Sequence, residues 1–357
     1  MKQLICISHT PWNHSPTRTQ QLLTRLKEVN ILFFELPEEK SKQEQGRKVR
    51  PNISVYTLPV ATAKNLNSRF LSSFALARAH RFISKTLQKH RFHEPTIWLN
   101  SPHFFSLPAK LPHRGLIYDC GREWDELPLD WESELALRSD VVFAASADLA
   151  QRLAPCCDNI AIIPNGVNYP MFSRGSTDTP PALTGLHEPL FVRVGSVTND
   201  LDLEPMLHAA SARPEWTFLL VGSVSESVRQ SLSGFRNIIF TGRVPMVEIP
   251  DFLYRCNVQF DLLSRHSAGS DILPAHLYEY LAVGKPIAMM IVPEQIEPFP
   301  DVAYTASNPA AFLRICEKAL AEDPTWLHER RQAYAREAQW SQRAAEIQQI
   351  LETAALL

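Results

Sequence analysis

Residues 267–286 read Ser-Ala-Gly-Ser-Asp-Ile-Leu-Pro-Ala-His-Leu-Tyr-Glu-Tyr-Leu-Ala-Val-Gly-Lys-Pro, a loop of small residues followed by a short helical pattern. Pro274 suits the first position of a helix, and Gly284 suits its C-terminal cap. The free N–H groups at the start of this helix, with the loop at Gly269 and Ser270, predict a site for an anion such as a diphosphate. The stretch therefore predicts a loop, a helix and a following strand around an anionic ligand.

Glu279 is the single acid within a helical run of Leu, Tyr and Ala. A carboxylate surrounded by such residues needs hydrogen-bond partners. The two hydroxyl groups of a ribose would supply two donors. A bond to neighbouring backbone, or an ion pair with Lys285, would serve as well, and the pattern leaves these alternatives open.

Short apolar runs alternate with helical patterns on both sides of this stretch. The expected strands are Leu4–Ser8, Asn30–Glu35, Ile53–Leu58, Thr96–Leu99, Gly115–Tyr118, Val141–Ala144, Ile160–Ile163, Leu190–Val194, Thr217–Val221, Ile238–Thr241, Val258–Leu262, Pro286–Met290 and Ala303–Thr305. The expected helices of the first half are Thr19–Lys27, Ser68–Lys89, Trp131–Arg138 and Ala147–Leu153. This alternation predicts an α/β fold with parallel sheets.

The length of 357 residues predicts two domains. Residues 173–188 contain two adjacent prolines with Gly, Thr and Ser, which indicates a linker. We therefore expect a domain over 1–172, a second domain over 189–340 and a C-terminal helix over 341–357. Both domains are expected to be Rossmann-like and doubly wound, with a ligand in the cleft between the carboxyl ends of their strands.

Composition excludes several classes of protein. The chain is 45% hydrophobic and 21% charged, with 12 Gly and 27 Pro, which excludes a collagen-like or disordered chain. Its longest apolar runs fall well short of the roughly 20 residues of a membrane span. The apolar run at Met1–Ser8 is too short for a signal peptide. The six cysteines have no zinc-binding spacing, so the expected location is the reducing cytoplasm.

The charge is unevenly distributed. Residues 1–172 carry a net charge of +5 and residues 173–357 a net charge of −7. Lys64–His93 contains seven Lys and Arg residues and no acid, interspersed with Phe and Leu. This pattern is typical of an amphipathic helix on anionic lipid, and equally of a surface helix packed through its apolar side. No nucleic-acid recognition motif accompanies it, so nucleic acid is not an expected partner.

The stretch quoted first resembles the signature of the GT-B nucleotide-sugar glycosyltransferases, family 4-like, of the teichuronic-acid and surface-polysaccharide type. That signature has two acids separated by seven residues and then a Gly-x-Pro turn, here Asp271, Glu279 and Gly284-Lys285-Pro286. The resemblance implies that Glu279 binds the ribose of the donor nucleotide. It also implies that Asp271 lies near the donor sugar as a catalytic residue. The run Leu277–Ala282, which includes Tyr278, is close to the subfamily's form.

Four further segments are similar to segments of this family, so the resemblance covers nearly the whole chain. They are Arg18–Leu23, Asp140–Leu149, Ile162–Phe172 and Phe240–Pro245. In the family the last of these ends a strand whose backbone frames the base, which implies roles for Arg243 and Val244. The order and spacing of these segments imply the GT-B fold, with two Rossmann-like domains.

Departures from the family pattern lie at the positions that would hold the diphosphate. Many members carry Arg and Lys after the first strand of the second domain, where this chain has Ser196 and Leu201. Relatives often carry Lys before the Leu-Tyr-Glu run, where this chain has His276. The diphosphate would then be bound by backbone N–H groups and by Arg193, Arg243 or His276.

The acceptor side is implied to be the N-terminal domain. Candidate residues there follow the expected strands: His103 and Asp119 as catalytic groups, and His9 and Arg18 beside the acceptor. A surface or capping role is an equally good interpretation for each of them. Members of the family normally require no metal, so the resemblance implies neither a metal nor another cofactor.

These features predict a metal-independent glycosyltransferase that moves a sugar from a nucleoside-diphosphate sugar to a glycan or lipid-linked acceptor in bacterial surface polysaccharide synthesis. The acid spacing favours retention of anomeric configuration. The expected location is the cytoplasm, at the inner face of the membrane. A nucleotide-sugar epimerase and a non-catalytic GT-B partner protein are the alternatives.

Overall fold

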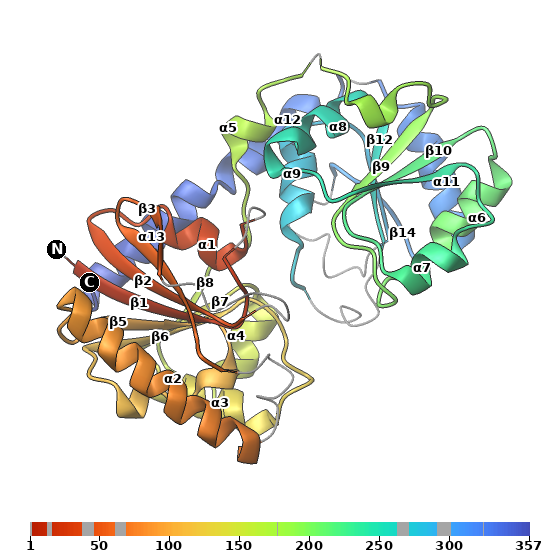
Figure 1. Cartoon of the computed structure of the whole chain (residues 1–357). Coiled ribbons are helices and arrows are strands. Elements are labelled where there is room, and N and C mark those ends of the chain that lie inside the picture. The colour runs from red at the N-terminus through yellow and green to blue at the C-terminus, as the bar shows by residue number, and fades with distance from the viewer. Residues whose placement is uncertain are drawn as a thin grey trace. The chain divides into compact units, whose positions relative to one another are not determined.

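The computed structural model describes residues 2–12, 16–37, 46–60, 69–176, 178–262, 271–290, 301–323 and 325–357. The chain forms two compact units, and Figure 1 shows a sheet with helices in each of them. Unit 1 consists of Met1–Pro164 and Ser341–Leu357, and unit 2 of Asn165–Trp340. Each unit is an α/β structure with its own sheet, as expected.

Unit 1 contains an eight-stranded sheet with the order β3-β4-β2-β1-β5-β6-β7-β8. Its strands are β1 (Lys2–Ser8), β2 (Val29–Glu35), β3 (Arg47–Arg50), β4 (Ile53–Thr57), β5 (Thr96–Leu99), β6 (Gly115–Cys120), β7 (Val141–Ala144) and β8 (Ile160–Ile162). All neighbours are parallel except β3 and β4. The central strands are buried on both faces, which is typical of a parallel sheet covered by helices.

The helices of unit 1 are α1 (Arg18–Leu23), α2 (Arg69–His90), α3 (Leu129–Arg138) and α4 (Ala147–Leu153). α13 (Trp340–Thr353) begins at the end of unit 2 and returns the chain to unit 1. Thr17 begins α1 with a capping box, in which Thr17 and Gln20 bond each other's backbone N–H groups. This cap fixes the first turn of α1, which carries two of the residues discussed below.

Unit 2 contains a six-stranded, wholly parallel sheet with the order β11-β10-β9-β12-β13-β14. Its strands are β9 (Leu190–Val194), β10 (Thr217–Val221), β11 (Ile238–Gly242), β12 (Val258–Asp261), β13 (Ile287–Met290) and β14 (Tyr304–Ala306). Its helices are α5 (Tyr169–Phe172), α6 (Glu204–Ala212), α7 (Glu226–Ser231), α8 (Ile249–Arg255), α9 (Ala275–Val283), α11 (Pro309–Leu320) and α12 (His328–Glu337). Two apolar cores cover the two faces of this sheet.

The sequence pattern placed most strands correctly and missed three details. β3 was not expected, since its sequence, Arg-Lys-Val-Arg, is polar and pairs only with the edge strand β4. α1 ends at Leu23, earlier than the expected Lys27. The expected boundary at residue 172 lies inside unit 2, because Val167 and Phe172 belong to the core of that unit.

Both sheets have a topological switch point, where the strand order reverses. In unit 1 it lies between β1 and β5, and in unit 2 between β9 and β12. Ligands of open α/β sheets bind outside the carboxyl ends of the strands at such points. The residues that follow β1, β5, β9 and β12 are therefore the first candidates for a site.

No helix within the described part of the chain is long and apolar enough to span a bilayer.

Candidate functional site

The candidate site in unit 2 is built on α9. Pro274 precedes this helix with extended backbone, and Gly284 ends it in the left-handed conformation at φ 82°. Tyr280 holds α9 against the sheet, since its hydroxyl accepts the Val194 N–H at 2.8 Å. All residues of α9 from Leu277 to Val283 are buried. The sequence-predicted Glu279 therefore lies on a rigid, mostly apolar helix.

Asp261, at the end of β12, joins three elements at the switch point of unit 2. Its carboxylate accepts hydrogen bonds from Arg193 Nε at 2.8 Å and from His276 Nε2 at 2.6 Å. Burial would raise the pKa of Asp261, but the charges of His276 and Arg193 outweigh it and hold the pKa at about 2. This network brings together Arg193 and His276, two of the three side chains expected at the diphosphate.

Glu279 lies three residues after His276, on the same side of α9. Its side chain is 9% exposed, and within the described residues no hydrogen bond or ion pair reaches its carboxylate. Burial raises the pKa of Glu279 to about 7, against a smaller lowering by the charge of His276. Lys285 does not pair with it here, because Lys285 Nζ bonds the Cys256 carbonyl oxygen at 2.6 Å. The carboxylate is therefore an unused acceptor.

The other residues expected at the donor are more dispersed. Ser196 is exposed after β9, and its carbonyl oxygen accepts from Arg193 at 3.2 Å. Arg243 is exposed and Val244 half-buried, directly after the edge strand β11. Asp271 is half-buried before α9.

Tyr278 and the glycine-containing loop complete the expected donor residues. Tyr278 is 4% exposed and packs in the apolar core of unit 2. The Tyr278 ring therefore packs α9 against the core, and this position does not favour its predicted contact with the donor. Gly269 and Ser270 lie outside the described residues.

The candidate site in unit 1 lies at the switch point between β1 and β5. His9 follows β1, and its Nδ1 lies 3.3 Å from Oδ1 of Asn100, which follows β5. Asn100 Nδ2 donates to Thr19 Oγ1 at 3.1 Å, and Thr19 Oγ1 donates to Asp119 Oδ2 at 3.1 Å. Arg18 Nε donates to the other oxygen of Asp119 at 2.9 Å. The structure thus joins His9, Arg18 and Asp119 in one hydrogen-bonded network.

Asp119 has a different place from the one expected. It is 1% exposed, and both of its oxygens accept from the first turn of α1. A buried carboxylate in an ion pair with Arg18 is poorly suited to accept a proton from a substrate. Asp119 is therefore a structural anchor for α1 and not a catalytic base.

His103 lies beside His9 at the same end of the sheet. The two rings are nearly parallel, with centroids 6.3 Å apart, and each meets the Trp124 ring edge to face. Burial lowers the pKa of His9 to about 4 and the pKa of His103 to about 4. Both imidazoles are therefore neutral at about pH 7.

Sequence reasoning missed Asp261, Asn100 and Thr19 as site residues. The first two had a signal, because each polar residue comes at the carboxyl end of an apolar strand at a switch point. Thr19 had none, since its contact with the site depends on the path of α1. Within the described ranges, no cluster of His, Cys, Asp and Glu could hold a metal ion.

The chain is similar to known proteins both in sequence and in structure. No protein-family profile matches the chain. In sequence it is 25% identical over 274 residues to the "Putative teichuronic acid biosynthesis glycosyltransferase TuaH" of Bacillus subtilis (strain 168), covering 69% of this chain and 68% of that protein.

Solved structures match nearly the whole chain at low identity. A sucrose-phosphate synthase from Thermosynechococcus elongatus has a TM-score of 0.79 and 15% identity, covering 99% of each chain. A structure from E. coli named for trehalose-6-phosphate and bound with UDP-2-fluoro glucose has a TM-score of 0.75 and 11% identity, covering 98% of this chain and 99% of that one. The solved structures confirm the predicted GT-B fold, and the sequence relative bears out the predicted class of enzyme, glycosyltransferase.

Proposed function

We propose that unit 2 binds a nucleoside-diphosphate sugar and that unit 1 binds the acceptor, a glycan or a lipid-linked sugar of a bacterial surface polysaccharide. The sequence relative named for teichuronic acid supports the surface-polysaccharide assignment. The structural neighbour bound with UDP-2-fluoro glucose supports a nucleotide-sugar donor. The reaction proposed is metal-independent transfer with retention of anomeric configuration.

The observation that carries the donor half is the unused carboxylate of Glu279. A buried acceptor with a pKa of about 7 and no hydrogen bond from the described residues gains most from a ligand that brings donors. A ribose diol brings two. The neighbouring Arg193 guanidinium and His276 imidazole, both held by Asp261, provide N–H groups for the diphosphate.

Calorimetric titration with UDP, GDP and CDP tests the donor site. We expect the wild-type chain to bind one of these nucleotides, and Glu279→Gln to weaken that binding by about tenfold to hundredfold, since bonds to a charged group are each worth about 1.5–3 kcal/mol. Glu226→Gln, at an exposed acid of α7, is the matched control and should bind as the wild type does. Absence of binding to all three nucleotides, or equal binding by Glu279→Gln, would contradict the proposal.

The acceptor half is tested by transfer. UDP-glucose, UDP-N-acetylglucosamine and UDP-glucuronic acid are offered with lipid-linked and free sugar acceptors, in the presence of a chelator. A new glycosidic product with the donor's anomeric configuration is expected. Inversion of that configuration, or transfer that stops when the chelator is added, would contradict the mechanism as proposed.

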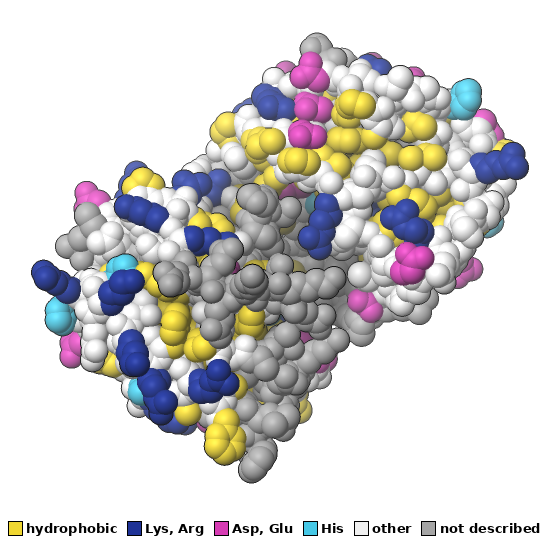
Figure 2. Space-filling view, in the orientation of Figure 1, with side chains coloured by type: hydrophobic (Ala, Val, Ile, Leu, Met, Phe, Trp, Pro, Cys, Tyr) yellow, Lys and Arg dark blue, Asp and Glu magenta, His cyan; other side chains and the backbone are white. Residues whose placement is uncertain are grey.

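We also propose that the exposed side of α2 meets an anionic membrane surface. The apolar side of α2 packs against unit 1 through Leu76, Ile83 and Leu87, so lipid would meet only the outer side. Lys and Arg side chains gather there, as Figure 2 shows over α2.

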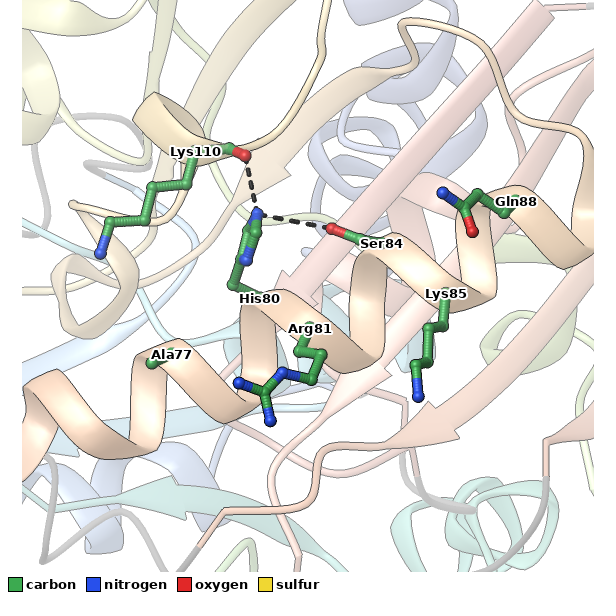
Figure 3. Close-up of a pocket in the computed structure, with 7 residues that line it drawn as sticks. All are labelled: Ala77, His80, Arg81, Ser84, Lys85, Gln88 and Lys110. Carbon is green, nitrogen blue, oxygen red and sulfur yellow. Dashed lines mark hydrogen bonds between the residues drawn. The ribbon is translucent and has the colours of Figure 1, made fainter.

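A cavity of about 350 Å³ lies on this side of α2. Arg81, Lys85 and Lys110 line it together with His80 and Ser84, and its lining contains no acid (Figure 3). The His80 ring bonds the carbonyl oxygen of Lys110 at 2.8 Å, which fixes the loop carrying Lys110 against the helix. Three cations around one hollow suit the phosphate of a lipid headgroup.

A further inference from the structure

The hydrogen-bonded network of unit 1 determines where the His9 ring carries its proton. The network runs from Asp119 through Thr19 and Asn100 to His9. Asp119 is paired with Arg18, and a carboxylate in an ion pair only accepts hydrogen bonds. Thr19 must therefore donate its single hydroxyl hydrogen to Asp119, so its oxygen accepts from Asn100.

A second anchor fixes the Asn100 amide in the same orientation. The hydroxyl of Ser8 donates to the Thr10 carbonyl oxygen at 2.9 Å, so it too accepts from Asn100 Nδ2, at 3.0 Å. With both neighbouring hydroxyls acting as acceptors, the nitrogen of the amide faces them and Oδ1 faces His9. Since Oδ1 accepts only, the hydrogen of the His9 ring lies on Nδ1.

This tautomer leaves Nε2 of His9 with a lone pair. Among the described residues no hydrogen bond reaches that atom, and the ring is half-buried. The centroid of the Trp124 ring lies 4.9 Å from the centroid of the His9 ring. The indole Nε1 of Trp124 is buried and also lacks a partner in the part of the chain that the structure describes. Among the described residues, His9 Nε2 is therefore a hydrogen-bond acceptor without a donor, and Trp124 Nε1 is a donor without an acceptor, on adjacent rings at the switch point of unit 1.

We propose that Nε2 of His9 accepts a hydrogen bond from a hydroxyl group of the sugar acceptor. Asn100, Thr19 and Asp119 are positioning residues, because they hold the ring in the Nδ1–H form. The inference rests on the proposed function only in naming a sugar as the ligand. The charged groups near the ring are Arg122 and Glu126, with His103 beside them, and none of them replaces Asn100 as the partner of Nδ1.

Nitrogen-15 NMR of the full-length chain, labelled at histidine, tests the tautomer directly. At about pH 7 we expect His9 to be neutral and protonated only on Nδ1, assigned by loss of its signals in His9→Gln. Thr19→Val combined with Ser8→Ala removes both hydroxyl anchors of the Asn100 amide, and we expect a mixture of both tautomers at His9. Thr19→Ser keeps both hydroxyls and should show the single form. A wild-type ring protonated on Nε2, or a double-variant spectrum identical to the wild type, would overturn the inference.

The hydroxyl ligand is tested in the same samples with methyl α-glucoside as the probe. A saturable shift of the His9 Nε2 resonance is expected, while the exposed His208 of unit 2 serves as the internal reference. A shift of His9 no larger than that of His208 would overturn hydroxyl binding. UDP binding by calorimetry should be unchanged in the Thr19→Ser variant and in the double variant. Absence of nucleotide binding by the wild type would contradict the donor proposal alone, since the NMR result at His9 does not depend on it.

Discussion

The pKa values of three polar side chains in the candidate sites are determined by the surroundings of each side chain. Burial raises the pKa of Glu279 to about 7, whereas His276 and Arg193 hold the pKa of Asp261 at about 2, although both acids are buried. His9 is neutral because burial lowers its pKa to about 4. The pKa of a carboxyl group is therefore raised at Glu279 and lowered at Asp261, according to whether a counter-charge lies beside it.

The raised pKa of Glu279 predicts a pH dependence of stability. Its pKa in the folded chain, about 7, exceeds its ordinary value of 4.5, so its contribution is fully present below about pH 4.5 and is lost as the pH rises through about 7. The loss is of order 3 kcal/mol. Urea unfolding at pH values on both sides of this window should show it in the wild type and not in Glu279→Gln. If the free energy of unfolding changes with pH in the same way in both proteins, the burial effect is refuted.

Gly222, directly after β10, shows a steric constraint at a single position. Its φ is 151°, and a Cβ atom there would lie 2.3 Å from the Gly195 carbonyl oxygen. Gly222→Ala should therefore destabilise the chain by about 1–3 kcal/mol, measured by urea unfolding. Gly234→Ala is the control, since a Cβ there meets nothing within 4 Å, and it should change stability by less than about 0.5 kcal/mol. Equal effects of the two substitutions would contradict this account.

At the scale of elements, the strands were predictable and the contacts between helices were not. Buried parallel strands are continuous apolar runs, so Thr96–Leu99 and Leu190–Val194 were expected with the bounds that they have. Helix ends depend on tertiary packing, which is why α1 ends before Lys27. Glu279 could be selected from its apolar surroundings on a helical pattern, but Asp261 ends a separate strand, and no local sequence pattern joins the two.

α12 is joined to the turn that follows α11 by a buried ion pair, which gives a prediction at this scale. Arg331 bonds both oxygens of Glu322, at 2.6 and 2.7 Å, and it also bonds the Val302 carbonyl oxygen at 2.7 Å. Both side chains of the pair are fully buried. Glu322→Gln should cost about 3–5 kcal/mol in urea unfolding, because it leaves an uncompensated buried charge.

The double variant Glu322→Leu with Arg331→Met is the comparison for that pair. Removing both charges together should cost less than the single change, because an apolar pair of similar volume needs no counter-charge. A double variant less stable than Glu322→Gln would show that the hydrogen bond from Arg331 to Val302 matters more than the charge balance.

At the scale of the whole molecule, the two halves differ in charge. Residues 1–172 carry +5 and residues 173–357 carry −7. The basic side of α2 in unit 1 accounts for much of this asymmetry. It predicts that association with a charged surface is oriented and is weakened by salt.

Vesicle sedimentation tests this orientation. The chain should sediment with vesicles that contain anionic phospholipid and not with neutral vesicles. Replacing Arg81, Lys85 and Lys110 by Gln should weaken binding by about a hundredfold, at about 1 kcal/mol for each cation near the surface. Equal sedimentation with both kinds of vesicle would refute the membrane proposal.

The matched control for that experiment removes three cations elsewhere. Gln at the exposed Arg229, Arg236 and Arg314 of unit 2 gives the same net charge as the α2 triple variant. This control should sediment nearly as the wild type does. A loss as large as that of the α2 variant would show that total charge alone, and no particular surface, determines binding.

The two ends of unit 2 are hydrogen-bonded to each other. Val167 N–H donates to the Ala338 carbonyl oxygen at 2.9 Å, and Trp340 N–H donates to the Val167 carbonyl oxygen at 3.0 Å. Gly166 fits there because a Cβ atom would lie 2.5 Å from the Ala338 oxygen. Because the ends of this segment lie together, we expect residues 165–340 to fold when expressed alone or when exchanged for the equivalent part of another enzyme. Under the proposed function, such chimaeras would change the donor and keep the acceptor.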